Sequence, residues 1–279
     1  MAHKNKQNRS PWKERQRSDP QASKKNLSGK HRHPTESFSF AEAADRLYDI
    51  FRHHGFADYP HEKRQKLTRF YFLLQENQKT QNFTRLINLR EIAIKHFIDS
   101  LIVAKLSKLS YPLMDMGTGA GFPGIPLKID SPENRILLAE GVQSRVTYLK
   151  SVREQLALSD LDIIGKFIDE SFVYPVQGVI TRAVEDITNT LSKCVNCLPV
   201  GGKVFLMKGP NVDPEVKAAK IQLGSYFQLD QDIAYELPET PHKRRLLVFE
   251  KIKNKGSSIW RNKFHARTIL TSGDGFRSN

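Results

Sequence analysis

A glycine-rich run, Asp115-Met-Gly-Thr-Gly-Ala-Gly-Phe-Pro-Gly-Ile-Pro126, constrains this chain most, and it directly follows an apolar stretch at 111–116. Gly117, Gly119 and Gly121 let the chain turn sharply and bring bare backbone against a ligand, where a Cβ would collide. Alternate glycines at the end of an apolar strand are typical of a nucleotide-cofactor loop. The run therefore predicts a strand, a binding loop and the start of a helix.

Two classes of cofactor fit this loop. Residues 119–124 match the G-x-G-x-x-G pattern of dinucleotide sites, so NAD stays an alternative. Asp115 precedes the first glycine by two residues, which suits the amino group of a methionyl moiety rather than a phosphate. Pro123 and Pro126 stiffen the segment into a tight turn, because proline is tolerated in the first turn of a helix. These features favour S-adenosyl-L-methionine (SAM).

A carboxylate ends the next apolar segment. Residues 135–139 are typical of a short buried strand, and Glu140 follows them, 19 residues after Gly121. An acid at this spacing from a glycine loop can accept hydrogen bonds from both ribose hydroxyls, whichever cofactor binds. The alternative is an ordinary solvated glutamate at the end of a strand.

The remaining pattern predicts an α/β fold. Helical spacing of apolar residues over 40–51 and 67–74, and again from Ile92 to Val103, precedes the first strand. Strands and helices then alternate, with strands expected near 111–116, 134–139, 160–166, 178–182, 202–208, 229–236 and 245–251. That order predicts a Rossmann-like, doubly wound sheet of seven mostly parallel strands, with the cofactor at the carboxyl ends of the strands.

Composition divides the chain into four parts. Residues 1–37 carry ten Lys or Arg against three acids and almost no apolar residue, so we expect a disordered basic extension. A helical part at 38–110 and a cofactor-binding core at 111–252 follow, and 253–279 form a polar C-terminal extension.

Charge and cysteine content narrow the function. The net charge of +14 on 279 residues favours a polyanionic partner, with nucleic acid a better fit than a membrane. No apolar run approaches a membrane span and no secretory signal opens the chain, so we expect a cytoplasmic protein. Cys194 and Cys197 lie in a helical apolar pattern without the further ligands that zinc needs, which predicts two reduced cysteines and no metal.

Further segments accompany the glycine run. They are Arg90-Glu-Ile-Ala-Ile-Lys-His-Phe-Ile-Asp-Ser100, Gly178-Val-Ile-Thr-Arg-Ala183, Leu206-Met-Lys-Gly209 and Arg244-Arg-Leu-Leu-Val248. Together they resemble the RsmG (GidB) family over roughly residues 40–252, and Gly-Phe-Pro-Gly-Ile-Pro is far more specific than alternate glycines alone. Members of that family are class I SAM-dependent methyltransferases that methylate N7 of a guanine, nucleotide 527 in the usual count, in 16S rRNA.

The resemblance implies roles for residues at matching positions. It implies that Gly117 and Phe122 line the cofactor pocket and that Glu140 holds the ribose. It also implies that Ile168 and Asp169 flank the adenine and that Arg182 closes the site. His96, Asp99 and Ser100 match a family motif beside the pocket. Basic positions suited to RNA phosphates are matched by Arg145, Lys208 and Arg245. From the residues alone, a structural histidine and ordinary solvated charges remain alternatives. The implied partner is 16S rRNA or the small ribosomal subunit.

The chain also departs from the family pattern. Gln177 stands where members commonly have Asp, Gly141 follows the ribose acid in place of Ser, and Phe167 replaces a common Arg. These changes keep open a second hypothesis, a non-catalytic RNA-binding or ribosome-assembly protein on the same fold. An NAD-linked oxidoreductase is a more distant third, because no Tyr-x-x-x-Lys pair follows the glycine loop. For the methyltransferase we nominate no general base, since guanine N7 needs no deprotonation and the catalytic task is alignment.

Overall fold

The computed structural model describes residues 37–81, 86, 88–182 and 184–255. The basic extension expected at 1–37 and the polar extension expected at 253–279 lie almost entirely outside these described residues. The chain separates into two units, Met1–Lys30 and His31–Asn279. Every helix and strand below belongs to the second unit.

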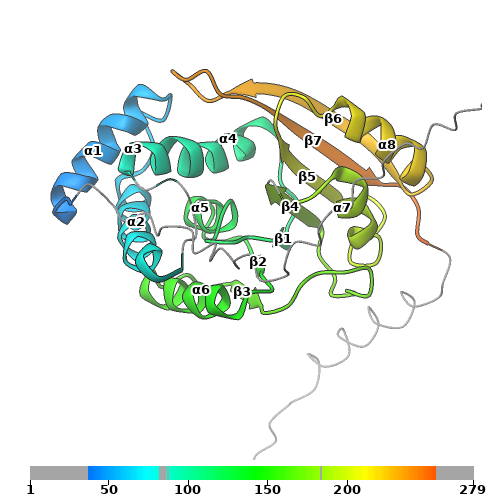
Figure 1. Ribbon diagram of the computed structural model, residues 1–279, viewed down its shortest axis with the longest axis horizontal. Helices are drawn as coiled ribbons and strands as arrows, with labels where there is room; N and C mark the ends of the chain where they lie inside the picture. Colours follow the sequence, from blue (N-terminus) through cyan, green and yellow to red (C-terminus); the bar gives the residue numbers. More distant parts are fainter. Residues whose placement is uncertain (1–36, 82–85, 87, 183, 256–279) are drawn as a thin grey trace, which may run out of the picture. The chain divides into compact units, whose positions relative to one another are not determined.

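Seven strands form one sheet in the order β3-β2-β1-β4-β5-β7-β6 (Figure 1). They are β1 (Leu113–Met116), β2 (Ile136–Ala139), β3 (Leu161–Ile164), β4 (Gly178–Arg182), β5 (Lys203–Lys208), β6 (Phe227–Glu236) and β7 (Lys243–Lys251). β7 is antiparallel to β5 and β6, and the other pairs are parallel. The predicted seven-stranded, mostly parallel sheet is confirmed. Its strand order reverses between β1 and β4, where doubly wound sheets bind their ligands.

Helices cover both faces of this sheet. They are α1 (Phe40–His53), α2 (His61–Gln81), α3 (Leu89–Ile92), the π-helix η1 (Ala93–Ile98), α4 (Asp99–Leu106), α5 (Gly124–Asp130), α6 (Gln143–Gln155), α7 (Ile187–Cys194) and α8 (Asp213–Leu223). α1 begins after Ser39, whose hydroxyl accepts a hydrogen bond from the Glu42 backbone N–H. It ends just before Gly55, which has a φ of +78°.

Alternate strand residues fill two hydrophobic cores, one on each face of the sheet. Leu113 and Ile180 belong to the core that also contains buried apolar residues of α1, α2, η1, α4, α5 and α6. Met114 and Val179 belong to the other core, with α7 and α8. This alternation follows because successive side chains of a strand point to opposite faces. The helical part at 38–110 therefore packs directly on the sheet that carries the glycine loop.

The helix predicted from Ile92 to Val103 is present but is not regular. Its middle, Ala93–Ile98, is a π-helix flanked by α3 and α4. A π-turn adds one residue per turn, and such turns occur frequently at functional sites. Spacing of apolar residues does not resolve one extra residue, so the sequence predicted a single continuous helix.

Cys194 and Cys197 are buried and not bridged, as predicted. No helix in the described ranges is long and apolar enough to cross a membrane. The same residues contain no cluster of three or more His, Cys, Asp or Glu side chains that could hold a metal ion.

Gly178, the first residue of β4, provides a test of how β4 packs against the chain around Ser110 and Leu113. A Cβ there would lie 2.4 Å from the carbonyl oxygen of Ser110 and 2.9 Å from Cδ1 of Leu113. Because a backbone oxygen cannot easily move away, we expect Gly178→Ala to lower the free energy of unfolding by about 1–3 kcal/mol in urea denaturation. Gly209→Ala is the matched control, since a Cβ at Gly209 meets no atom within 4 Å. Equal stabilities of the two variants would contradict the packing.

Candidate cofactor and substrate site

The glycine loop leaves β1 at the carboxyl edge of the sheet and enters α5. Gly117, Gly119 and Gly121 have φ values of +74°, +60° and +102°, a backbone region that favours glycine. The Gly117 N–H donates to the carbonyl oxygen of Ala139 at 2.9 Å, which ties the loop to β2. At Gly121 a Cβ would lie 2.3 Å from Cδ1 of Ile125. The predicted sharp turn that requires glycine is confirmed.

Asp115 is fully buried near the end of β1. Its Oδ2 accepts hydrogen bonds from the Thr118 hydroxyl at 2.6 Å and from the Gly124 N–H at 2.7 Å. Its Oδ1 has no hydrogen-bond partner in the part of the chain that the structure describes. Burial raises the pKa of Asp115 to about 6, although the two hydrogen bonds oppose the rise. One oxygen therefore holds the loop, and the other is left for a further donor.

Glu140 follows β2 and faces the same loop. Its Oε2 accepts a hydrogen bond from the Gly119 N–H at 3.0 Å, and its Oε1 accepts one from the Val142 N–H at 2.8 Å. Arg145 lies close by, with Nη1 3.7 Å from Oε2. Each carboxylate oxygen has two lone pairs, so ribose hydroxyls can still donate to it. The structure places the predicted ribose acid against the loop, and the ribose contact itself stays a prediction.

A cavity of about 320 Å³, the loop cavity, opens beside the glycine loop. Gly117, Glu140, Phe167, Ile168 and Arg182 contribute to its walls. The cavity therefore lies at the carboxyl ends of β1, β2, β3 and β4, where the sheet topology places ligands.

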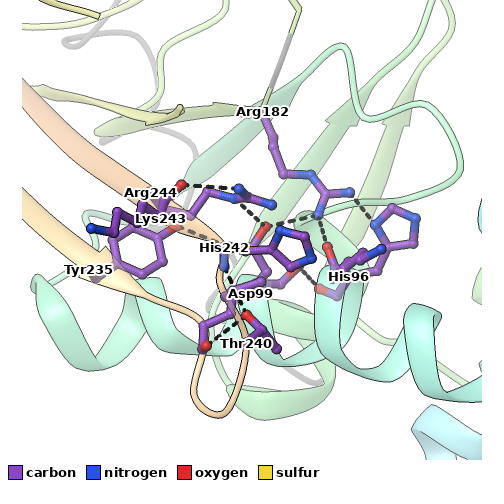
Figure 2. Close-up of polar contacts among 11 residues, drawn as sticks. His96, Asp99, Arg182, Tyr235, Thr240, His242, Lys243 and Arg244 are labelled. Atoms are coloured by element: carbon purple, nitrogen blue, oxygen red, sulfur yellow. Dashed lines mark hydrogen bonds and ion pairs between the residues drawn. The ribbon is translucent and has the colours of Figure 1, made fainter. Parts of the chain in front are cut away.

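Arg182 ends β4 and reaches across to η1 and α4 (Figure 2). Its Nη1 donates to the Lys95 carbonyl oxygen at 2.9 Å and to Asp99 Oδ2 at 3.4 Å. Its Nη2 lies 2.8 Å from Nδ1 of His96. A guanidinium has only donors, so His96 accepts at Nδ1 and carries its single proton on Nε2. Burial, reinforced by the Arg182 charge, holds the pKa of His96 well below its usual value, which agrees with a neutral ring.

Phe122 supports this pair from the glycine loop. Its ring stacks on the His96 ring, with centroids 4.3 Å apart and planes at 16°. The Arg182 guanidinium lies over the same ring, 5.4 Å from the centroid. Phe122 is buried and is not among the residues that line the loop cavity. Its implied contact with the cofactor stays a prediction, and its observed contacts are with Arg182 and His96.

Asp99 completes the buried network. Its Oδ1 accepts a hydrogen bond from the Tyr235 hydroxyl at 3.0 Å, and its Oδ2 lies 3.8 Å from Nε of Arg244. Burial raises the pKa of Asp99, while Arg182, Arg244 and the Tyr235 hydroxyl oppose the rise. Figure 2 shows this carboxylate between the two arginines, beside the turn that carries Thr240. Sequence reasoning missed Tyr235 and Arg244 as site residues. Arg244 lay within a quoted motif, which was the available signal.

A second cavity, of about 410 Å³, adjoins this network and is called the basic cavity below. Its walls include Lys95, His96, Asp99, Lys208 and Arg244. Arg182 lines both cavities and is therefore a wall residue that they share. Ser100 is buried, and its hydroxyl donates to the His96 carbonyl oxygen at 2.6 Å.

All three residues predicted to contact RNA phosphates are engaged in ion pairs, Arg145 with Glu140 as described above. Lys208 lies 2.9 Å from Glu215, and Arg245 lies 2.6 Å from both Asp213 and Asp232. These partners raise the pKa of Arg245, with the Asp232 hydrogen bond as the largest cause. The role predicted for Lys208, Arg245 and Arg145 at RNA phosphates stays a prediction.

Comparison with known proteins decides the family. Residues 63–247 match the family described as rRNA small subunit methyltransferase G (GidB). A ribosomal RNA small subunit methyltransferase G 2 from Bdellovibrio bacteriovorus is 57% identical over 226 residues, which cover 81% of this chain and 89% of that protein. This chain belongs to the methyltransferase G family.

Two further relatives support the same family assignment. The methyltransferase G 2 from Syntrophobacter fumaroxidans is 40% identical, over 76% of this chain and 42% of that protein. The methyltransferase G from Clostridium tetani is 36% identical, over 65% of this chain and 80% of that protein. The resemblance found in the sequence motifs is therefore confirmed.

The family resemblance assigned Ile168 and Asp169 to the adenine, and the structure places the two residues differently. Ile168 lines the loop cavity, as implied. Asp169 is exposed, and its carboxylate accepts hydrogen bonds from the hydroxyl and the backbone N–H of Ser171, which lower the pKa of Asp169. Asp169 is not a lining residue of the loop cavity, and its contact with adenine stays a prediction.

The loop cavity fits SAM, the methyl donor expected for the methyltransferase G family. The left-handed glycines leave bare backbone for a methionyl group, and Glu140 suits the ribose. The buried Asp115 oxygen without a partner suits an ammonium group and would repel a pyrophosphate. Asp115 precedes the wall residue Met116 and is not itself a lining residue of the loop cavity, so its contact with the amino group stays a prediction. The prediction of SAM rather than NAD is confirmed by membership of a methyltransferase family.

The raised pKa of Asp115 predicts a pH-dependent affinity for SAM. Protonation of this carboxylate, with a pKa of about 6, removes its attraction for the amino group of SAM. We expect the affinity to fall by roughly tenfold per pH unit below about 6, as measured by calorimetric titration. His96 does not contribute, because burial holds the pKa of its ring well below the usual value.

Asp115→Asn is the control for this titration. The amide keeps the shape of the carboxylate, so we expect a weaker affinity at neutral pH that changes little on acidification. A wild-type affinity that stays level as pH falls from about 8 to about 5 would show that Asp115 does not attract the cofactor through its charge.

Proposed function

We propose that this protein transfers a methyl group from SAM to N7 of a guanine in 16S rRNA, the guanine at nucleotide 527 that the family resemblance implies. The observation that carries the proposal is that two cavities share Arg182 as a wall residue. The loop cavity suits a nucleotide cofactor, and the basic cavity suits a base with its flanking phosphates. In the cytoplasm, where we place the reaction, the partner is the small ribosomal subunit or its RNA.

On the cofactor side, the residues of the loop cavity position the donor. When bound, SAM supplies an electrophilic methyl group on its sulfonium. Glu140 would accept hydrogen bonds from the ribose hydroxyls, and Asp115, next to the wall residue Met116, would attract the amino group. Because these residues would hold two different groups of the cofactor, they would restrict its position in the cavity. Such alignment can lower the barrier by several kcal/mol.

On the substrate side, the basic cavity orients the guanine. N7 carries an in-plane lone pair, so no residue has to remove a proton, and the neutral His96 is consistent with this. The adjacent O6 is an acceptor, which Lys95 or Arg244 can satisfy. A donor at N7 itself would block the nucleophile. The carboxylate of Asp99 lies in the wall of the same cavity, where its negative charge stabilises the positive charge that the guanine gains.

Access of the target base requires it to leave its stack, since the chemistry takes place inside a cavity. Basic side chains around the opening neutralise the flanking phosphates and release counterions. We therefore expect RNA binding to weaken steeply with salt, and methyl transfer that is undiminished at several hundred millimolar salt would contradict this docking.

The proposal is tested by methyl transfer to small ribosomal subunits that lack the modification. Labelled SAM provides the methyl group, and the product is located by chemical cleavage at N7-methylguanine. We expect one methylated guanine with the wild-type protein and little transfer with Asp115→Asn. SAM binding without methylation of any guanine would overturn the proposal and favour a non-catalytic RNA-binding protein.

Arg244 tests the substrate side separately. We expect Arg244→Ala to raise the KM for the subunit by roughly tenfold, the size of one lost charged contact to nucleic acid, and to leave the Kd for SAM within about twofold. Arg46→Ala is the control, because Arg46 is an ion-paired arginine on the exposed surface of α1. Steady-state kinetics and calorimetry separate the two effects. Equal weakening of both ligands by Arg244→Ala would contradict an assignment to the substrate side.

A further inference from the structure

Two departures from the family pattern meet in space. Gly141 follows Glu140 at the end of β2, and Phe167 follows β3, the parallel neighbour of β2. A Cβ on Gly141 would lie 2.5 Å from three different carbon atoms of the Phe167 ring. Because these distances are equal, the Cβ direction of Gly141 points at the face of the ring. The ring therefore lies over the bare backbone of Gly141, and any side chain at 141 would displace it.

The ring is not part of a hydrophobic core. Phe167 is 75% exposed, although it is held in place against Gly141, and it lines the loop cavity. Single exposed aromatic residues are common on proteins and need no ligand. This one differs because it depends on a glycine at a second position and because it forms the wall of a cavity.

The position of the ribose acid indicates what the ring faces. Glu140 lies next to Gly141 in the chain, and its carboxylate is held against the glycine loop by the Gly119 N–H. A nucleoside whose ribose was held by Glu140 would have the remaining walls of the cavity available for its base. Those walls include Gly141, Phe167 and Ile168.

We propose that Phe167, seated on Gly141, is an aromatic wall that stacks against the adenine of the cofactor. The inference rests on the proposed function, because it assumes an adenosine cofactor in the loop cavity. Phe167 contributes affinity through its π-face, and Gly141 contributes by leaving room for the ring. The two residues therefore act as one unit, in which the observed position of Phe167 requires the glycine at 141.

Calorimetric titration with S-adenosylhomocysteine and with adenosine tests the wall. Stacking of a base on an aromatic side chain is lost on substitution by alanine, so we expect Phe167→Ala to weaken both ligands by about ten- to one-hundredfold. Tyr174→Ala is the matched control, since Tyr174 is a partly exposed aromatic residue of the same loop that does not line the loop cavity. We expect this variant to bind both ligands within about twofold of the wild type. The unfolding transition of each variant shows that it is folded.

A double-mutant cycle tests the dependence on Gly141. We expect Gly141→Ser to weaken S-adenosylhomocysteine binding in the wild-type background, because the Ser Cβ displaces the ring. In the Phe167→Ala background the same substitution is expected to have little effect, since there is no ring to displace. Additive effects of the two substitutions would show that they do not act as a unit.

The outcomes separate this inference from the proposed function. If the wild type binds the adenosine ligands and Phe167→Ala binds them with the same affinity, the aromatic wall is overturned and the methyltransferase proposal stands. A Phe167→Ala variant with unchanged cofactor affinity but a raised KM for the subunit would overturn it as well, because the ring would then contact RNA. Absence of wild-type binding to any adenosine ligand would overturn both.

Discussion

The site depends on the guanidinium of Arg182, a side chain that is only 17% exposed. Removing such a charge from water costs several kcal/mol unless it is paired and hydrogen-bonded. Asp99, the Lys95 carbonyl and His96 provide its partners, and all three lie on η1 and α4. Arg182 itself ends β4, so satisfying its charge ties the helical part to the carboxyl edge of the sheet. The same contacts set the protonation of His96 and place Arg182 in the walls of both cavities.

The parallel sheet concentrates chemistry at that edge. β1, β2 and β4 end there, which brings the glycine loop, Glu140 and Arg182 together although they are far apart in the chain. β7 runs the opposite way, so its beginning rather than its end reaches the same edge, with Arg245 paired to Lys208. This reversal explains how Arg244 comes to line a cavity with residues of η1 and β5.

Much of this arrangement was predictable from the sequence. Apolar runs located all seven strands, and the glycine positions matched the left-handed φ values. Patterns did not predict the π-helix at Ala93–Ile98, because apolar spacing is insensitive to one added residue. The family resemblance assigned Phe122 to the cofactor, and that contact stays a prediction; the observed contacts of its ring are with His96 and Arg182. Lys208 and Arg245 were expected to contact phosphates, and their acidic neighbours come from distant segments that no local pattern relates to them.

The sequence by itself determined the fold class, the loop and the family, because each rests on local spacing, on the conformational freedom of glycine or on contiguous motifs. Only the tertiary structure decided which side chains form ion pairs with one another and which line a cavity. Gly141 and Phe167 illustrate the difference, since each looked like a separate departure until the pairing of β2 with β3 placed them in contact. Contacts between residues far apart in the chain depend on how strands are ordered in the sheet, and that order is a property of the whole packed molecule.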